Sequence, residues 1–291
     1  MSKSLPKNIQ CNFIINWRAF QEIGGSFIEK LQGTASIRLV KFPEVRYNVY
    51  QVVRVGICMN DNLLGAIHSR IERNEPARVL LRDLMRDAEV YLFGGAVRDY
   101  LDGRFESLRD MDFVVESRSD ALIDIEGYFP DDADARKIRN RYNGYKVIFS
   151  DGLIMDIWNL EDTWTFKTGK LMATAENLIH TVYLNFDGVV YSLGEDKYLL
   201  DSDKRYERIK ESGVLDIVND ETPFEELNLV RALVFRERYS MTFSDKLKGR
   251  MREVYSADRE RTIRNFMEHQ ISHYNSVVLD EAKLKGILNA L

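Results

Sequence analysis

The chain has 291 residues, of which 45% are hydrophobic and 30% charged, as in a globular protein of one large domain or two modest ones. Its formal net charge of −5 excludes a surface that is basic throughout, so any RNA site must be a local basic patch. The two cysteines, Cys11 and Cys58, lie far apart and form no CxxC, which argues against a zinc site or a disulfide framework.

The N-terminal sequence predicts neither an export signal nor a membrane anchor. Met1 to Lys7 is not followed by an apolar segment, and no run approaches the roughly 20 apolar residues of a membrane-spanning helix. Two thiols in a chain of this size suit a reducing compartment. We therefore expect a cytoplasmic protein without a membrane partner.

Residues 1–60 have the least regular pattern in the chain. Apolar residues at 12–23 are spaced in a partly helical way, and β-branched and aromatic residues at 36–59 favour two or three strands. We interpret this segment as an N-terminal extension whose fold the sequence does not define.

Residues 61–200 predict a domain that mixes helices and strands. Residues 62–87 predict one helix, or two short helices broken near Pro76. A short apolar strand, Val90–Phe93, then leads through two glycines into a helix that starts at Ala96. The later elements follow in this order: a strand at 110–116, a helix near 120–128, and strands at 144–149 and 153–158 joined by a turn at 150–152.

The last third of the chain, residues 201–291, predicts helices. A dense apolar stripe begins after Phe224 and continues in three further helical segments, for two of which Ser244 and Asp258 are candidate N-caps. This region also carries a group of cations that either face solvent or contact RNA: Lys246, Lys248, Arg250, Arg252, Arg259, Arg261 and Arg264.

The turn at Gly94-Gly95 has the composition of a phosphate-binding loop. Two glycines between a strand and a helix let backbone N–H groups approach an anion, and the helix N-terminus adds partial positive charge. Arg98, one turn into the helix, can supply a forked cation. Taken alone, such a turn is usually no more than a turn.

Three aspartates follow the glycine turn. Asp110 and Asp112 begin an apolar strand, where residues i and i+2 face the same side, so the two carboxylates converge. Asp156 lies in the middle of another apolar strand, which leaves two interpretations: an edge strand with Asp156 facing water, or a third carboxylate at the same site. Convergent carboxylates beside a phosphate-binding turn suggest Mg²⁺ and phosphoryl or nucleotidyl transfer.

The glycine turn and the Asp pair, in this order, resemble the head-domain motif of the tRNA CCA-adding enzyme and bacterial poly(A) polymerase family. That motif reads roughly GGxVRDxLLGR and then DxDxxV, and the family belongs to the DNA polymerase beta-type nucleotidyltransferase superfamily. The resemblance runs from Glu89 to His269. It implies an α+β fold, in which a nucleotidyltransferase head with a mixed sheet (61–200) precedes an all-helical, neck-like domain (201–291).

The same resemblance implies roles for the residues of the motif. Gly94, Gly95 and Arg98 would hold the triphosphate of an NTP such as ATP. Asp110, Asp112 and Asp156 would hold two Mg²⁺ ions, with Asp156 as the third carboxylate that helps to bind metal or to activate the attacking hydroxyl. The reaction would then be in-line attack by an acceptor hydroxyl on the α-phosphorus.

Two downstream segments resemble the family's nucleotide-contacting motifs only in part. In the first, Asn185 matches, but Ile179, His180 and Thr181 stand where the family has Arg-Arg-Asp. In the second, Arg231 matches, while Glu225 and Asn228 replace the base-reading Asp and Arg. We therefore expect Asn185 and Arg231 to contact the nucleotide and Glu225 and Asn228 to line a base pocket, with altered sugar and base selection.

The leading hypothesis is a Mg²⁺-dependent nucleotidyltransferase that acts on an RNA 3′ end of the tRNA type. One alternative is a transferase that modifies a protein or a small molecule. Another is a catalytically inactive nucleotide-binding or protein-interaction module, and a third makes the chain one half of a complex whose partner protein binds the acceptor. Three carboxylates at one site argue against loss of catalysis, because an inactive protein has no physical need for them.

Overall fold

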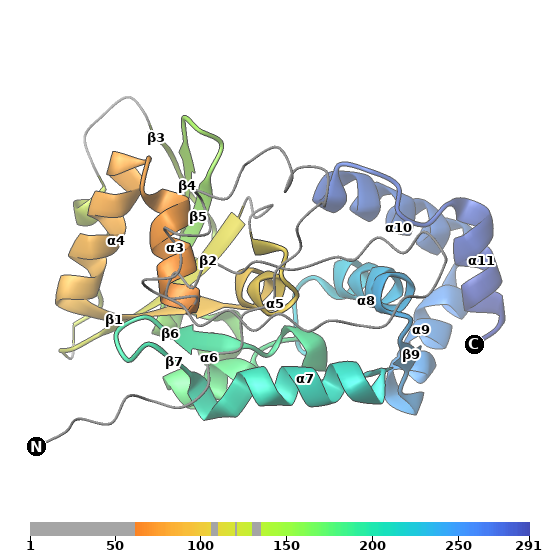
Figure 1. The fold of residues 1–291 in the computed structure, drawn as a ribbon. Coiled ribbons are helices and arrows are strands. Elements are labelled where there is room, and N and C mark those ends of the chain that lie inside the picture. The colour runs from red at the N-terminus through yellow and green to blue at the C-terminus, as the bar shows by residue number, and fades with distance from the viewer. Residues whose placement is uncertain (1–61, 106–109, 120, 130–134) are drawn as a thin grey trace, which may run out of the picture. The chain divides into compact units, whose positions relative to one another are not determined.

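The computed structural model describes residues 62–105, 110–119, 121–129 and 135–291, and Asn62–Leu291 form one compact unit (Figure 1). The helix and strands expected within residues 1–60 lie outside the described residues. The division of the remaining chain at residue 200 stays a prediction. Within the described part, no helix combines the length and apolar character needed to cross a bilayer.

Two helices precede the sheet, as one of the two alternatives predicted. They are α3 (Leu63–Ile71) and α4 (Glu75–Asp87). The break lies before Pro76: α3 ends at Ile71, and Asn74 caps α4 by accepting a hydrogen bond from the Ala77 N–H. Pro76 sits in the first turn of α4, where its missing N–H costs nothing.

A seven-stranded mixed sheet forms the centre of the unit, in the order β3-β4-β5-β2-β1-β6-β7. Only β2 and β5 are parallel neighbours; the other adjacent pairs are antiparallel. The strands are β1 (Ala88–Phe93), β2 (Asp110–Ser117), β3 (Ala135–Arg139), β4 (Tyr145–Phe149), β5 (Ile154–Asn159), β6 (Val190–Ser192) and β7 (Lys197–Tyr198). The predicted α+β fold with a mixed sheet is confirmed.

The two faces of the sheet have different surroundings. Alternate residues of the central strands, such as Leu92, Phe113 and Met155, belong to the large core that also contains the buried faces of α3 and α4. On the other face a smaller cluster around Tyr91 and Val114 packs against the irregular segments after β5. Side chains alternate along a strand, so Asp110 and Asp112 lie on the same face of β2 as Val114. The two aspartates therefore point to this second face.

The prediction of an α-helix near 120–128 is wrong. Only η2 (Ile125–Tyr128), a single 3-10 turn, forms there. Gly127 and the nearby Pro130 disfavour a longer helix. Further short elements follow β5 and β6: η3 (Leu160–Asp162), α6 (Trp164–Lys167), η4 (Ala175–His180), η5 (Asn185–Asp187) and η6 (Leu199–Asp201).

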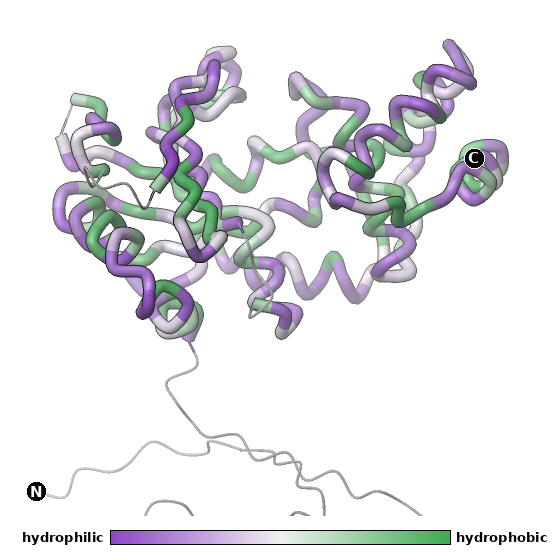
Figure 2. Tube along the Cα trace, turned by 90° about the horizontal axis from the view of Figure 1, so that it is seen from above, coloured by the Kyte–Doolittle hydropathy of each residue, from purple (hydrophilic) through white to green (hydrophobic). Residues whose placement is uncertain are grey.

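The C-terminal part is helical, as predicted. It contains α7 (Ser202–Ser212), α8 (Glu225–Tyr239), α9 (Asp245–Ala257), α10 (Arg259–Tyr274) and α11 (Glu281–Asn289). Ser244 and Asp258 cap α9 and α10 through their side chains. A parallel pair of two-residue strands, β8 (Val214–Leu215) and β9 (Thr242–Phe243), was not predicted. Hydrophobic and hydrophilic stretches alternate along these helices (Figure 2).

Asp102, directly after α5 (Gly95–Leu101), ties the glycine-turn helix to the helical part. Its carboxylate accepts hydrogen bonds from Tyr206 on α7 (2.9 Å), Tyr239 on α8 (2.7 Å) and Lys210 (2.6 Å). Burial alone would raise the pKa of Asp102, but the hydrogen bonds from Lys210, Tyr239 and Tyr206 outweigh it and hold the pKa below its usual range.

The Asp102 contacts predict a pH-dependent stability. A folded pKa below the unfolded value of about 3.9 gives stabilisation that is present above pH 4 and is lost as pH falls further. We expect Asp102→Ala to lower the free energy of unfolding by about 3 kcal/mol at pH 7 in urea titrations, with a smaller loss at pH 3. Asp245→Ala, which removes an exposed carboxylate, is the control. An equal loss at both pH values would contradict the ionic origin.

Candidate active site

The glycine turn has the backbone geometry that only glycine adopts readily. Gly94 follows β1 with φ +67° and ψ −117°, and its N–H donates to the Val189 carbonyl (2.9 Å). Gly95 then begins α5. The first N–H groups of a helix have no partner within the helix, so this turn can offer donors to an anion. The predicted contact of Gly94 and Gly95 with a triphosphate stays a prediction.

The register of two parallel strands brings the carboxylates together. Asp112 on β2 lies directly opposite Asp156 on β5, and Asp110 is two residues earlier on the same face of β2. All three are half-buried. Of the two interpretations of Asp156, the structure therefore supports the shared site: β5 lies between β4 and β2 and is not an edge strand.

Crowding of negative charge affects the protonation of these aspartates. Burial raises the pKa of Asp112 to about 7; the charges of Asp156 and Asp110 add to this rise, whereas Lys146 and Arg231 oppose it. Burial also raises the pKa of Asp156, against the effect of Lys146. Burial and the crowded carboxylates thus outweigh the effect of Lys146 and Arg231, as expected where a further cation is to bind.

Lys146 was not predicted, and it partly supplies that charge. It lies opposite Asp156 on β4, and its ammonium is 2.5 Å from the Asp156 carboxylate. The sequence did contain a signal for Lys146, which is a charged residue within the apolar strand Tyr145–Phe149. Once β4 and β5 are paired as a hairpin, Lys146 falls on the same face of the sheet as Asp156.

The donor set has the chemistry of a magnesium site. Carboxylate oxygens are the ligands that Mg²⁺ prefers, and the raised pKa of Asp112 marks charge that a divalent ion would neutralise. Among the residues that the structure describes, however, no three Asp, Glu, His or Cys side chains are gathered closely enough to hold a metal. The Asp156 carboxylate is paired with Lys146 instead.

Arg98 lies inside the protein, in an ion pair that was not anticipated. Its guanidinium pairs with Asp187 in η5 and lies over the ring of Phe235, 4.7 Å from the ring centroid. Arg231 on α8 binds the same Asp187 carboxylate at 2.8 Å. Asp187 thus connects α5 to α8. A direct contact of Arg98 with phosphate would require the Arg98–Asp187 ion pair to break. Arg231, by contrast, is close enough to Asp112 to lower the pKa of that carboxyl.

Asn185 forms a structural contact. Its side-chain amide donates to the Val214 carbonyl (3.0 Å) and accepts from the Asp216 N–H (3.0 Å). Both ends of the amide are therefore engaged with the backbone that leads into and out of β8. The predicted nucleotide contact would require these bonds to open.

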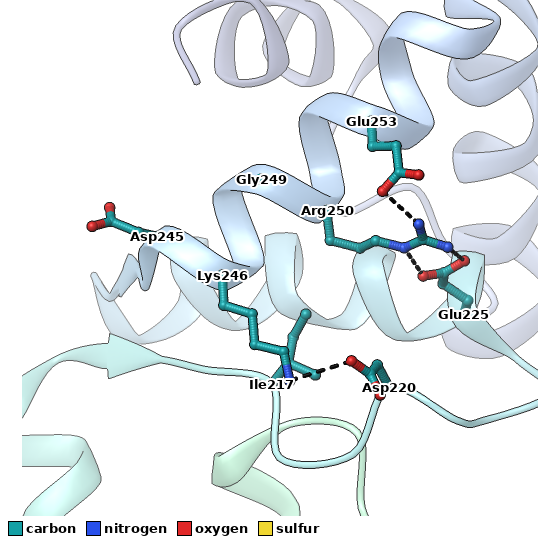
Figure 3. A pocket seen from close by; sticks show the side chains of 8 residues that line it. All are labelled: Ile217, Asp220, Glu225, Asp245, Lys246, Gly249, Arg250 and Glu253. Carbon is teal, nitrogen blue, oxygen red and sulfur yellow. Dashed lines mark hydrogen bonds and ion pairs between the residues drawn. The ribbon is translucent and has the colours of Figure 1, made fainter.

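Glu225 and Asn228, the predicted base-pocket residues, both have protein partners. Arg250 on α9 donates hydrogen bonds from two guanidinium nitrogens to the Glu225 carboxylate, one of them at 2.7 Å (Figure 3). This pair lines a cavity of about 500 Å³. The buried Asn228 donates to the Thr222 hydroxyl (2.9 Å). None of Asp110, Asp112 and Asp156 lines this cavity. The structure thus does not bring these residues into the carboxylate cluster.

The predicted group of cations on α9 and α10 is partly neutralised. Lys246 pairs with Asp220 (3.3 Å), Lys248 with Asp245 (3.4 Å) and Arg250 with Glu225 and Glu253. The alternative of a charged, solvated helix face therefore fits α9 better than RNA contact does.

The fold is similar to that of solved CCA-adding enzymes. The structure of "CCA-adding enzyme with CTP" superimposes with a TM-score of 0.53 at 18% identity, covering 79% of this chain and 55% of that one. Two apo forms give TM-scores of 0.53 at 17% identity (79% and 54% covered) and 0.51 at 18% identity (78% and 56% covered). The chain spans about half the length of these structures. At this identity the likeness shows the fold alone.

Comparisons of the sequence with protein families and with curated proteins found no match. The resemblance of the glycine turn and the Asp pair is therefore supported by the fold around them and not by overall sequence similarity.

Proposed function

We propose that the protein is a metal-dependent nucleotidyltransferase, which transfers a nucleoside monophosphate from a nucleoside triphosphate to an acceptor hydroxyl. The observation that carries this proposal is the register of β2 and β5, which aligns Asp112 with Asp156 and keeps Asp110 on the same face. Asp110 and Asp112 begin β2, which follows β1, the Gly94-Gly95 turn and α5, and this turn can offer backbone donors to a phosphate.

Within this proposal the protein's own residues position the reactants. Asp110, Asp112 and Asp156 would hold Mg²⁺, which when bound supplies charge stabilisation for the attacking and leaving oxygens. The N–H groups of the glycine turn would orient the triphosphate. Arg231, near Asp112, would balance charge that develops on the phosphates. No covalent intermediate with the protein is needed, because positioning and electrostatics suffice for this reaction.

An RNA 3′ end of the tRNA type is the acceptor that we favour. The solved structures of this fold include CCA-adding enzymes, which supports an RNA acceptor by analogy. Glu225 and Asn228 stand where the resemblance expects a base-reading Asp and Arg, and both have protein partners. We therefore propose that the choice of nucleotide differs from that of a CCA-adding enzyme.

The test uses the purified full chain with Mg²⁺ and each of four α-labelled ribonucleotides. Total RNA, total protein and small hydroxyl compounds are offered as separate acceptors. We expect label to enter RNA with one base preferred, and to be absent with EDTA or in Asp110→Ala/Asp112→Ala. Label in protein or a small molecule would replace the RNA acceptor by that class. Nucleotide binding without transfer to any acceptor would favour an inactive binding module.

A further inference from the structure

A basic run lies along the edge strand β3 and the turn to β4. Residues 135–144, which form β3 and the turn to β4, contain four cations and no acid, in a chain of net charge −5: Arg136, Lys137, Arg139 and Arg141. β3 is the edge strand, and these side chains are exposed. Among the described residues, Arg139 and Arg141 form no ion pair, unlike the cations of α9.

Three aromatic rings, two of them exposed, adjoin the end of this basic run. Tyr142, in the β3–β4 turn, packs edge-to-face against Trp164 of α6 (centroids 5.5 Å apart) and Phe224, the residue before α8 (6.2 Å). Trp164 is 41% exposed and Phe224 47% exposed. The Arg141 guanidinium lies 4.8 Å from the ring centroid of Tyr142 and 5.8 Å from that of Phe224. Arg139 lies over the ring of Tyr145, on the opposite face of the sheet, and is not part of this group. We call Arg141, Tyr142, Trp164 and Phe224 the aromatic–basic platform.

The rings of the platform are held in place. The Trp164 indole N–H donates to the Glu221 carbonyl (3.2 Å), which fixes the ring plane. Lys167, on the same helix, donates to the Tyr142 carbonyl (3.1 Å) and ties α6 to the turn. An exposed ring that is already oriented loses little conformational entropy when a flat partner stacks on it.

The turn that carries the platform connects the edge strand to β4, whose Lys146 lies opposite Asp156. Ile138, Lys146 and Asp156 lie opposite one another on β3, β4 and β5, and Asp156 lies opposite Asp112 on β2. Neighbouring strands are roughly 4.8 Å apart, so the edge strand lies about 14 Å from the strand of Asp112. The turn that carries Arg141 and Tyr142 leads directly into β4 and its Lys146.

We propose that the aromatic–basic platform binds a single-stranded RNA segment beside the 3′ end of the acceptor. Exposed rings beside a cation form a surface that can hold a single strand, since bases stack on the rings and a phosphate contacts the cation. A protein partner would need a more continuous apolar patch, and a duplex offers no free base faces. The inference rests on the proposed function for the identity of the RNA as acceptor.

Binding is measured first, without nucleotide and in EDTA, so that it is independent of catalysis. A fluorescent single-stranded oligoribonucleotide is titrated with the full chain, its single-stranded DNA equivalent and an RNA duplex serving as comparisons. Loss of one stacking ring weakens binding roughly 10-fold. We therefore expect Trp164→Ala/Phe224→Ala to bind the single strand at least about 10-fold more weakly, with Trp164→Phe close to wild type.

The cation is tested through the salt dependence of binding. For single strands each phosphate contact contributes about 0.7 to the slope of log K against log salt, so Arg141→Gln should lower the slope by about 0.7. The Arg141 side chain is exposed, so this variant is expected to fold and keeps the test valid even if the ring variants do not fold. Ile271→Ala on α10 and Arg208→Gln on α7, both at exposed residues, are the matched controls and should bind as wild type.

The outcomes separate the two proposals. If no acceptor is labelled but the ring and cation variants weaken single-strand binding as expected, the platform stands and the proposed transferase activity falls. Unchanged binding by both sets of variants would overturn the platform. So would equally tight binding of duplex RNA, or an effect of the ring variants on nucleotide affinity alone, which would assign the rings to the base of the incoming nucleotide.

Discussion

Asp112→Asn is expected to abolish nucleotide transfer, by about 10³-fold or more, while the protein stays folded. The substitution preserves shape but removes the charge at the centre of the carboxylate cluster, opposite Asp156. Single-turnover incorporation of labelled nucleotide gives the rate. Asp201→Asn, at an exposed carboxylate in a left-handed conformation that asparagine tolerates, is the matched control and should keep full activity.

Asp112→Asn should also be more stable than the wild type in the absence of metal. A folded pKa of about 7, above the unfolded value of about 3.9, means that this carboxyl destabilises the fold progressively as pH rises from about 4 to 7. An amide avoids this cost, which we expect to be on the order of 1–3 kcal/mol at pH 8 after allowance for solvent screening. Melting curves at pH 8 and pH 5 in EDTA measure it, with the difference smaller at pH 5.

Either of two results would contradict the assignment of Asp112. Retained transfer would exclude a metal-binding role. A lower melting temperature at pH 8 would mean that the carboxylate stabilises the metal-free fold, as an ordinary structural aspartate does, and that the crowding of negative charge is absent. Higher stability with lost activity is the pattern expected where a protein keeps unfavourable charge for function.

Local patterns in the sequence were sufficient to predict the elements that carry the site. The strand, the glycine turn, the helix and the Asp pair are encoded within about two dozen consecutive residues, where alternation and glycine geometry act directly on the backbone. Asp156 could be predicted because a charge inside the apolar strand Leu153–Trp158 requires a reason. The register that places it opposite Asp112 comes from the sheet.

The partners of the arginines could not be predicted in this way. Arg98 and Asp187 are 89 positions apart, and Arg231 meets the same carboxylate from a third segment. Nothing in local spacing distinguishes an arginine that will be buried from one that will face a ligand, since both follow a glycine turn equally well. Lys146 lies closer in sequence to Asp156, but its effect depends on the pairing of two strands.

Asp187→Ala is expected to destabilise the protein by about 3–5 kcal/mol, because it leaves the buried Arg98 and the partly buried Arg231 without their shared carboxylate. The side chain of Asp187 is 8% exposed and that of Arg98 9%. Urea unfolding at neutral pH gives the free energy. Adding Arg98→Met should recover much of the loss, since the rings of Phe186 and Phe235 already flank this side chain.

The Asp187 variant also tests whether the two arginines can serve as a phosphate subsite. With the carboxylate gone, Arg98 and Arg231 would be available to an anion, so inorganic tripolyphosphate should raise the melting temperature of Asp187→Ala more than that of the wild type. Asp187→Ala/Arg98→Met should lose most of this difference. Equal shifts in all three proteins would restrict the Arg98–Asp187–Arg231 contacts to linking α5 with α8, and phosphate binding would then rest on the N–H groups that follow Gly94.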